Sequence, residues 1–387
     1  AVGGTAADTE GIKVAVRVRP FLPHESGSSS CVEVNGDANQ ISIGRSDRSS
    51  RALLESSGRK GGGIASSSAA KPRKTFTFDH ALAGNTPQND VYDSCVSTLV
   101  ANCLEGFNAT TLAYGQTGAG KTYTILGPSA ASAVGVNDEV SREVGIIPRA
   151  LGELFDGLEK SKNEMSATVG GERMEGSDNA PAAPLSFEYN VKLQFLELYG
   201  EDIRDLLAPT GKTGTKPTKL TIRDTKNDCE VLGATSVDVS GADDALLCLT
   251  RGMLKRVTAA TAMNAESSRS HAIMSVLIEQ VKYVDGEKTV IKSKFNFVDL
   301  AGSERAKRTG AAGQRLKEGI DINKGLLVLG NVISALASID PSKTKTKFVP
   351  FRDSKLTRIL RGSLGGDHKT LLFVCVSPSA RNFGGIP

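Results

Sequence analysis

The chain of 387 residues is predicted to adopt an α/β fold, a mostly parallel sheet with helices on both faces. Two observations lead to this prediction. Short β-prone segments alternate with helical repeats along the chain, which is typical of parallel strands joined by helical connections. A glycine-rich loop near residue 115 also separates a β-prone segment from a helical one. Since no segment resembles a linker between two cores, one domain is expected.

Four segments carry the strand patterns. Lys13–Arg19 alternates strictly, with three valines on one face, and is predicted to form a half-buried strand. Lys192–Tyr199 and Lys294–Leu300 are also predicted as strands. Thr370–Val376 is almost uniformly apolar, so we expect it in the centre of the sheet, where both faces are buried.

One helix is marked by its apolar repeat. Leu326, Leu329, Ile333 and Leu336 recur at intervals of three and four residues, which places them on one helical face. The helix is predicted to run from about residue 323 to 337.

Three segments are not expected to join the core. Residues 42–74 are crowded with Ser, Gly and Arg, and residues 160–184 with Gly, Glu, Ser and Ala. Both are predicted to be flexible surface insertions, acting as spacers or as sites of regulatory serine phosphorylation. Residues 1–10 are predicted to be an N-terminal tail.

Composition excludes several classes of protein. The six cysteines show no C-x-x-C spacing and the four histidines lie far apart, which argues against a disulfide framework and a zinc or histidine metal centre. No apolar run approaches the length of a membrane span, and the N-terminus lacks the apolar region of a signal peptide. We therefore expect a protein of a reducing, intracellular compartment.

The glycine-rich loop fits a phosphate-binding pattern. Gly115–Thr122 (GQTGAGKT) matches G-x-x-x-x-G-K-[ST], in which backbone N–H groups surround a phosphate and the lysine reaches its outer oxygens. A chain with 41 glycines could contain this string by chance. The context favours function, because Thr110–Tyr114 is β-prone before the loop and Lys121–Leu126 can begin a helix after it.

Two further strings follow downstream. Asn264–His271 (NAESSRSH) alone could be a serine-rich turn, and Asp299–Glu304 (DLAGSE) alone could be a strand that ends in a tight turn. Together with the loop, they indicate a nucleoside-triphosphate site whose later parts sense the terminal phosphate.

These three strings, in this order, resemble the kinesin motor domain. The resemblance runs from about Gly11 to about Asn382, and residues 304–310 and 315–319 are most similar to the chromokinesin subfamily. It implies an eight-stranded mixed sheet, ATP as the nucleotide and Mg²⁺ as the metal. Further similar segments lie at 17–20 (RVRP), 145–149 (GIIPR), 195–199 (FLELY), 329–336 (LGNVISAL) and 349–358 (VPFRDSKLTR).

The expected nucleotide contacts combine loop chemistry with the resemblance. Loop amides are expected to hold the α- and β-phosphates, and Lys121 to bridge β and γ. The resemblance places Ser267 over the γ-phosphate, and Pro20 and Tyr123 on the two faces of adenine with Arg17 beside them. Because these residues would hold the base mostly by stacking, discrimination between ATP and GTP should be modest. The full set of cofactor-binding residues is Arg17, Pro20, Gly115, Gln116, Thr117, Gly118, Ala119, Gly120, Lys121, Thr122, Tyr123 and Ser267.

Metal and catalytic roles follow in the same way. The Thr122 hydroxyl is expected to bind Mg²⁺, and the resemblance adds Ser268 as a second hydroxyl and Asp299 through a metal-bound water. Gly302 is expected to donate its N–H to the γ-phosphate. The resemblance also implies that Arg269 and Glu304 form a salt bridge and that Glu304 accepts a proton relayed from the attacking water; two unrelated surface charges are the alternative.

The concentration of basic residues near the C-terminal end of the chain predicts the kind of partner that it binds. Residues 340–361 contain seven basic and two acidic residues, a surplus of five in a chain whose net charge is only +4. Such a surplus suits an acidic partner, although a solvated basic face is the alternative. Because the run holds only two aromatics and no base-reading module, nucleic acid is disfavoured. A kinesin-like chain would present these segments to microtubules, with contacts expected from Lys307, Arg308, Arg315, Lys317, Arg352, Lys355 and Arg358.

The C-terminal residues depart from the kinesin pattern. Residues 383–387 (FGGIP) stand where a final helix and neck linker would begin. We therefore expect either a piece of a longer protein or an ATPase without directed stepping, and dimerisation would need sequence outside this chain.

The predicted function is a microtubule-activated ATPase of the cytoplasmic cytoskeleton. A non-motile microtubule-binding or regulatory module with residual nucleotide binding is the main alternative. A Ras-type GTPase is disfavoured because no N-K-x-D string follows the switch segments.

Overall fold

The computed structural model describes most of the chain. The described residues are 11–44, 73–128, 143–170, 186–209, 219–262, 267–284, 287–304, 314–339 and 348–385. The predicted tail (1–10) and much of both predicted insertions (45–72 and 171–185) lie outside them. Within the described part, no helix is long and apolar enough to cross a membrane.

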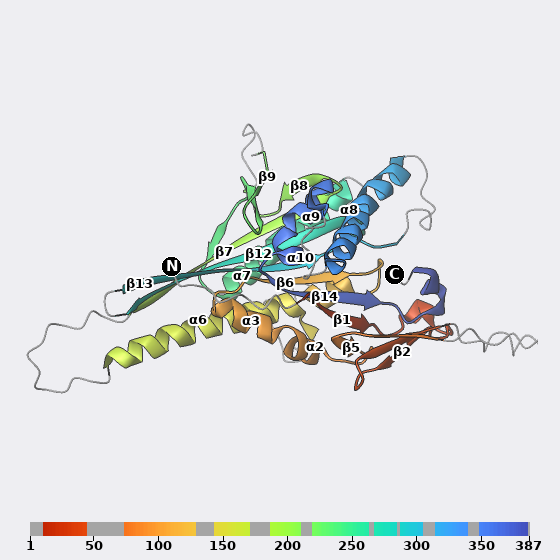
Figure 1. Cartoon of the computed structure of the whole chain (residues 1–387), viewed down its shortest axis with the longest axis horizontal. Coiled ribbons are helices and arrows are strands. Elements are labelled where there is room, and N and C mark those ends of the chain that lie inside the picture. The colour runs from red at the N-terminus through yellow and green to blue at the C-terminus, as the bar shows by residue number, and fades with distance from the viewer. Residues whose placement is uncertain are drawn as a thin grey trace, which may run out of the picture.

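A large mixed sheet forms the centre of the molecule (Figure 1). Its eight-strand path follows the order β11-β7-β12-β13-β6-β14-β1-β5, and β8 adds a ninth strand by pairing with β7. This confirms the predicted eight-stranded mixed sheet. The strands are β11 (Val237–Val239), β7 (Ser186–Tyr199), β12 (Ser270–Val284), β13 (Glu287–Asp299), β6 (Ala109–Tyr114), β14 (Lys369–Val376), β1 (Lys13–Val18), β5 (His80–Leu82) and β8 (Asp202–Asp205).

Parallel and antiparallel pairing divide this sheet into two halves. From β13 through β6, β14 and β1 to β5 every pair is parallel. From β11 through β7 and β12 to β13, and between β7 and β8, every pair is antiparallel. The predicted central strand is β14, which lies between β6 and β1 as expected. Ligands of open α/β sheets bind beyond the carboxyl ends of parallel strands, so the site is expected where β1, β6 and β13 end.

Helices cover both faces of the sheet (Figure 1). On one face a single apolar cluster joins the sheet to α2, α3, α4, α6 and α7. On the other face a second cluster joins it to α8, α9 and α10. The helices are α2 (Gln88–Cys95), α3 (Ser97–Leu104), α4 (Lys121–Leu126), α6 (Ile146–Gly170), α7 (Ala242–Ala262), α8 (Gln314–Ala337), α9 (Lys355–Ile359) and α10 (Arg361–Gly365).

Two small sheets flank this core. A three-stranded sheet of β2 (Val32–Asn35), β3 (Gln40–Ile43) and β4 (Lys74–Thr77) packs beside β1 and β5. A hairpin of β9 (Thr221–Asp224) and β10 (Cys229–Leu232) lies next to α9.

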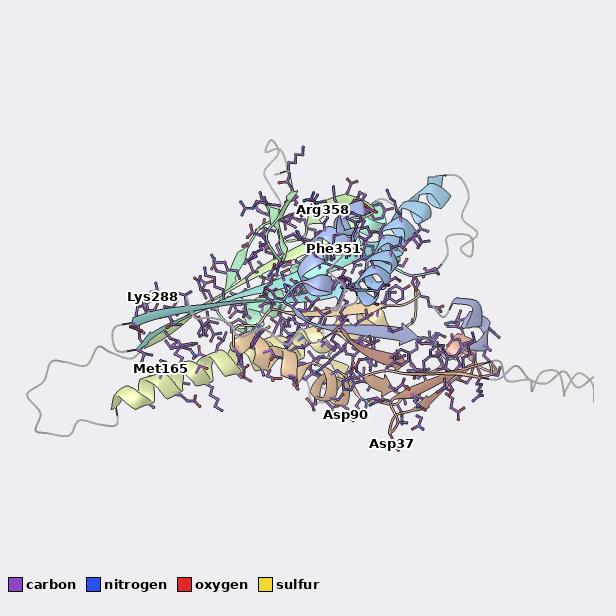
Figure 2. The ribbon with its side chains drawn as sticks, in the orientation of Figure 1. Asp37, Asp90, Met165, Lys288, Phe351 and Arg358 are labelled. Atoms are coloured by element: carbon purple, nitrogen blue, oxygen red, sulfur yellow. The ribbon has the colours of Figure 1, made fainter. Side chains whose placement is uncertain are left out.

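The structure corrects several predicted boundaries. The insertion predicted over 42–74 begins and ends in paired strands, β3 and β4. The insertion predicted over 160–184 starts as helix, because α6 continues to Gly170. Charge pairs one turn apart, such as Lys160 with Glu164, and the packing of Met165 on the core favour this extension (Figure 2). The helix predicted over 323–337 begins earlier, at Gln314.

The first strand is also more buried than its alternation predicted. Ala15, Val16, Arg17 and Val18 are all buried, so both faces of β1 are covered over this stretch. The alternation misled because Arg17, a charged residue on the supposed outer face, has buried polar partners.

Candidate functional site

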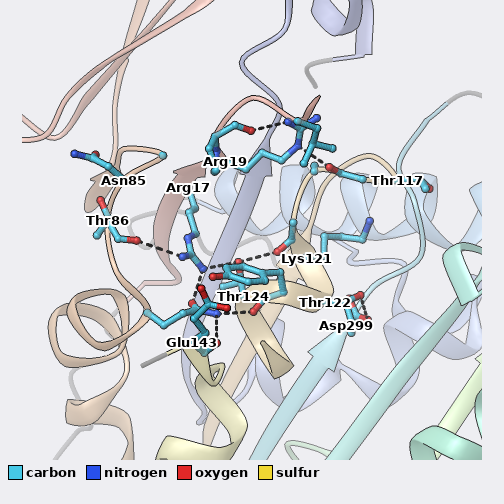
Figure 3. A pocket seen from close by; sticks show the side chains of 18 of the residues that line it. Arg17, Arg19, Asn85, Thr86, Thr117, Lys121, Thr122, Thr124, Glu143 and Asp299 are labelled. Carbon is cyan, nitrogen blue, oxygen red and sulfur yellow. Dashed lines mark hydrogen bonds between the residues drawn. The ribbon is translucent and has the colours of Figure 1, made fainter. Parts of the chain in front are cut away.

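A cleft of about 870 Å³ opens beyond the carboxyl ends of β1 and β13 (Figure 3). Its volume suits a small ligand of nucleotide size. Its lining also includes residues that were not predicted, among them Gly84–Gln88 and Glu143. The predicted site residues that do line it are Arg17, Pro20, Thr117, Gly118, Ala119, Gly120, Lys121, Thr122, Tyr123, Ser268 and Asp299.

The glycine-rich loop lies as predicted between β6 and α4, whose bounds confirm the strand, loop and helix order. Gly115 has φ +149°, and a Cβ there would come within 2.3 Å of the carbonyl oxygen of Cys375. Only glycine fits this close approach to β14. Gly120, immediately before α4, has φ +100°. The loop therefore keeps a tight conformation in which its backbone amides are available to phosphate oxygens.

Lys121 is buried inside this loop. Its ammonium donates to the carbonyl oxygens of Gly115 at 2.9 Å and Gln116 at 3.0 Å. Burial lowers the pKa of Lys121, and the nearby carboxylate of Asp299 opposes that shift. A buried ammonium whose partners are neutral carbonyls is a strong binding group for an anion.

Thr122 and Asp299 bring several side-chain oxygen atoms together beside the loop. The Thr122 hydroxyl donates to Asp299 Oδ2 at 2.8 Å, and Ser268 lines the same cleft. The other carboxylate oxygen of Asp299 is buried and has no hydrogen-bond partner among the described residues. Hydroxyls and a carboxylate are the ligands that Mg²⁺ prefers, directly or through water, so these residues fit the predicted metal.

Residues of the second and third strings, Ser268, Gly302 and Glu304, contact the glycine-rich loop or one another. Glu304 accepts hydrogen bonds from the Thr117 N–H at 2.9 Å and from the Thr117 hydroxyl at 2.5 Å. The Gly302 N–H donates to the carbonyl of Ser268 at 2.8 Å. A Cβ on Gly302 would lie 2.4 Å from the Thr117 hydroxyl and from Glu304 Oε2, so a larger residue here would displace these two side chains. The two segments that are predicted to sense the terminal phosphate therefore meet beside the glycine-rich loop.

The Glu304 carboxyl is held in its ionised form. Burial alone would raise its pKa, but the two hydrogen bonds from Thr117 and the charge of Lys121 bring the net shift below the ordinary value. Arg269 lies in a short turn, Ser267–Arg269, just before β12. Its predicted salt bridge with Glu304 stays a prediction, and the Ser267 side chain lies outside the described residues.

Arg17 lies in the part of the cleft where the base is predicted to bind. Its guanidinium lies 5.5 Å from the ring centroid of Tyr123, and it donates to Gln88 Oε1 at 2.7 Å and to Thr124 Oγ1 at 3.0 Å. These contacts fix Arg17, labelled in Figure 3, beside Tyr123, and Pro20 lines the same cleft, so the three residues predicted to hold the base share one cleft. Sequence reasoning missed Gln88, since no pattern marks the start of α2 as part of the site.

A second arginine, Arg19, was also missed. Its Nε donates to the carbonyl of Gly118 at 2.7 Å, which ties the end of β1 to the loop. Its guanidinium also bonds both oxygens of Glu25, and this lowers the pKa of Glu25 to about 2. Its position in the RVRP string, one residue before Pro20, was the signal that could have identified it.

Two further buried residues, Arg256 and His271, lie next to Asp299 or to the segment that follows it. Arg256 of α7 lies 3.5 Å from Asp299 Oδ2, and no sequence pattern predicted it. His271, the last residue of the second string, accepts a hydrogen bond from the Ala301 N–H at 3.0 Å. Burial, with the charges of Arg256 and Lys121, lowers the pKa of His271 to about 3, so the imidazole is neutral at pH 7.

The predicted basic face is only partly described. Lys307 and Arg308 lie outside the described residues, and for Arg315 and Lys317 only their place in α8 is described. Arg352 and Arg358 both pair with Asp224 of β9, at 2.9 and 3.2 Å. Figure 2 shows Arg358 and Phe351 on the side of the sheet that carries α9. The surplus of five therefore overstates the free charge here, because Asp224 lies outside the segment that was counted.

Comparison with known proteins gives consistent results. The sequence matches the model of the family "Kinesin motor domain" over residues 17–385. "Kinesin-like protein KIF21B" of Homo sapiens is 40% identical over 96% of this chain, and "Chromosome-associated kinesin KIF4" of Xenopus laevis is 41% identical over 96%. The chain spans 21% and 25% of the lengths of these two relatives.

A solved structure agrees with these matches. It is described as "Structure of a fast kinesin: Implications for ATPase mechanism and interactions with microtubules" and has a TM-score of 0.73 to this chain. The two are 33% identical in sequence, and the match covers 97% of this chain and 88% of the other.

Proposed function

Since this chain belongs to the kinesin motor domain family, we propose that it hydrolyses ATP in the cleft and couples hydrolysis to microtubule binding and movement. One observation carries the proposal. The phosphate loop, the oxygen pair of Thr122 and Asp299, and the Glu304 carboxylate meet at one end of the cleft. Phosphoryl transfer to water needs this set: donors and a cation for the phosphates, oxygen ligands for a metal, and an acceptor for the proton.

The phosphates are held by the loop. Backbone amides of Gly115–Thr122 bind the α- and β-phosphates, and the Lys121 ammonium exchanges its two carbonyl partners for β- and γ-phosphate oxygens. The hydroxyls of Thr122 and Ser268 would hold the metal, and the Asp299 carboxylate would accept a hydrogen bond from a water bound to it. When bound, Mg²⁺ neutralises charge on the phosphates.

The proton is taken up at Glu304. Its carboxylate is ionised at neutral pH and accepts the proton relayed from the attacking water, while Arg269 orients it. Gly302 exchanges the Ser268 carbonyl for the γ-phosphate as the acceptor of its N–H, so phosphate release returns the segment to the contact seen here. The switch is thus a change of hydrogen-bond partner.

The microtubule contact is assigned to the face that carries α8 and α9. Lys355 and Arg358 lie on α9, and Arg352 lies just before it. Tubulin is acidic, so a basic face of this kind supports attraction and orientation. A site of action on the cytoplasmic cytoskeleton follows from this partner.

Steady-state ATPase assays with and without microtubules test the proposal. We expect slow hydrolysis by the chain alone and a large stimulation by microtubules. Binding to both nucleotide and microtubules without stimulated turnover would instead identify the non-motile module. Absence of nucleotide binding would contradict the proposal as a whole.

A further inference from the structure

A second cavity, of about 450 Å³, lies under the hairpin of β9 and β10 and shares no lining residue with the cleft. Strands β7, β12 and β13 form its floor, and the end of α9 forms one wall. The hairpin and α9 lie on the same side of the central sheet (Figure 1). The volume of this cavity is within the usual range of small-molecule sites.

A row of polar side chains crosses the floor of this cavity and continues beyond it. Residues directly opposite one another on neighbouring strands point to the same face of a sheet. The row runs across β7, β12, β13, β6 and β14 and consists, in that order, of Gln194, Ser275, Asn296, Thr110 and Thr370. The next row on the same face is apolar throughout and consists of Leu196, Ile273, Val298, Leu112 and Leu372. The polar row is therefore a local departure from an apolar face.

Over β6 and β14 this polar row is covered by polar partners. Thr110 Oγ1 lies 2.7 Å from Ser363 Oγ of α10 and 2.9 Å from Nδ1 of His368. The Thr370 hydroxyl donates to the Ser363 carbonyl at 2.6 Å. This half of the row is buried, and its hydroxyls are satisfied by the segment that packs on it.

Over β7, β12 and β13 the same row faces the cavity instead. The Ser275 hydroxyl donates to Asn296 Oδ1 at 2.7 Å, but the amide nitrogen of Asn296 has no acceptor among the residues that the structure describes. Asn296 is only 4% exposed, so its free N–H groups are those of a buried side chain. Gln194 donates to the Ser236 hydroxyl at 2.9 Å, which leaves its Oε1 as an acceptor. The floor thus offers a donor and acceptors side by side.

The rest of the lining is apolar or electrically compensated. Ile359 and Leu360 at the end of α9 and Leu232 of the hairpin contribute apolar surface. Of the charged lining residues, Lys294 is paired with Asp228 and Glu230 with Arg223. No lining charge of the described residues therefore calls for a charged ligand, and burying one here would be unfavourable.

We infer that this cavity is a binding site for an uncharged amphipathic molecule with a carboxamide head and an apolar body. The carbonyl of such a head accepts from Asn296, and its N–H donates to the oxygen of Ser275 or Gln194. The apolar body packs between α9 and the hairpin. The ligand completes the polar row over β13 and β12 as Ser363 and His368 complete it over β6 and β14. This inference is independent of nucleotide binding in the cleft.

A single fluorescent reporter tests the inference. The chain contains no tryptophan, so Leu232→Trp places its only indole at the cavity, at a position that is 40% exposed. Titration with benzamide should change the emission saturably, with a midpoint on the order of 1 mM for a ligand of this size. Benzoate has the same shape but carries a charge, and it should bind roughly 10-fold more weakly or less. Leu254→Trp, at an exposed position of α7, should show no saturable change.

Variants of the floor, made in the Leu232→Trp chain, identify the contact. Asn296→Leu removes the donor and should weaken benzamide binding by roughly 5- to 10-fold, the value of one hydrogen bond. Gln194→Leu, at a partly exposed position of the same row, replaces it if Asn296→Leu does not fold, and the same direction is expected. Asn190→Leu, at an exposed position of β7 outside the cavity, is the control and should leave the midpoint unchanged.

Three results would overturn the inference. The first is no saturable response of Leu232→Trp to benzamide, as expected of a cavity that holds only water. The second is equal affinity for benzamide and benzoate. The third is an unchanged benzamide midpoint in whichever floor variant is folded.

Discussion

The charged groups at the phosphate end of the cleft differ in setting from those on the face of α9. Lys121, Asp299 and Arg256 are no more than 7% exposed. On the α9 face the Arg352 side chain is 78% exposed and pairs with Asp224 across the surface. Electrostatic interactions are strong where water is excluded and weak where it screens them. Single substitutions should therefore have large effects in the cleft and small effects on the face.

The largest effect is expected at Glu304. Glu304→Ala removes the proton acceptor and should lower turnover by about 10²- to 10⁴-fold, the usual contribution of a general base. ATP binding should persist, so the variant should remain bound to microtubules. Single-turnover hydrolysis together with cosedimentation in ATP measures both. The control is Glu287→Ala, at the exposed far end of β13, and hydrolysis by Glu304→Ala at the parental rate would remove Glu304 from catalysis.

A smaller loss is expected at Lys121, and in a different quantity. Lys121→Ala removes the ammonium that reaches the phosphates and should weaken ATP binding roughly 10- to 100-fold, the value of a hydrogen bond to a charged group. Equilibrium titration with a fluorescent nucleotide measures it. Lys288→Ala, at the hairpin tip labelled in Figure 2, is the control. Equal affinity of Lys121→Ala and the parent would contradict the assigned contact.

The residues that line the cleft could be predicted from the sequence more fully than the ion pairs of the α9 face, for a physical reason. The loop and the two switch strings constrain the backbone itself, as at Gly115, where any Cβ would meet Cys375. Such constraints act over a few residues and can be read locally. Gln88 and Arg256 reach the site only through tertiary packing, so no local pattern marks them.

The charge count over 340–361 missed two ion pairs on the α9 face for the same reason. Asp224 lies on β9, far from Arg352 and Arg358 in the sequence, and the fold brings it against both. The extent of α6 and the two-sided burial of β1 were likewise missed, because both depend on neighbours remote in the chain.

The burial of His271 beside the cleft also predicts that the stability of the fold depends on pH. The pKa of His271 is lowered to about 3, so the folded protein keeps this imidazole neutral while the unfolded chain protonates it near the ordinary value. The unfolded state therefore binds more protons between about pH 6.5 and pH 3, and stability falls as pH decreases through that window.

Thermal denaturation between pH 8 and pH 5 measures this effect. His271→Gln supplies an amide in place of the imidazole that accepts from Ala301, and it should lose less melting temperature than the parent over this range. A difference of roughly 2 °C is expected, because the free energy of unfolding falls by about 2 kcal/mol between pH 6.5 and pH 5 and about 1 kcal/mol corresponds to roughly 1 °C in a chain of this length. His24→Gln, at an exposed position, should follow the parent. Identical slopes for the parent and His271→Gln would show that His271 does not set the dependence.

The smallest effect is expected on the basic face, where it also tests how far Asp224 offsets the charge that was counted. Asp224 neutralises part of the charge of Arg352 and Arg358, so Asp224→Asn should strengthen microtubule binding and steepen its salt dependence. Exposed pairs contribute about 0.2–1 kcal/mol, so the gain in microtubule affinity should be only a few-fold.

Replacing Lys355 and Arg358 together with alanine should weaken microtubule binding and its salt dependence, and it should leave the microtubule-free ATPase unchanged. Cosedimentation over a salt series compares these variants with Asp238→Asn, which releases a surface lysine at the β11 edge. If Asp224→Asn binds no more tightly than Asp238→Asn at low salt, the arginines next to Asp224 do not face the microtubule, and the contact must lie elsewhere on the molecule.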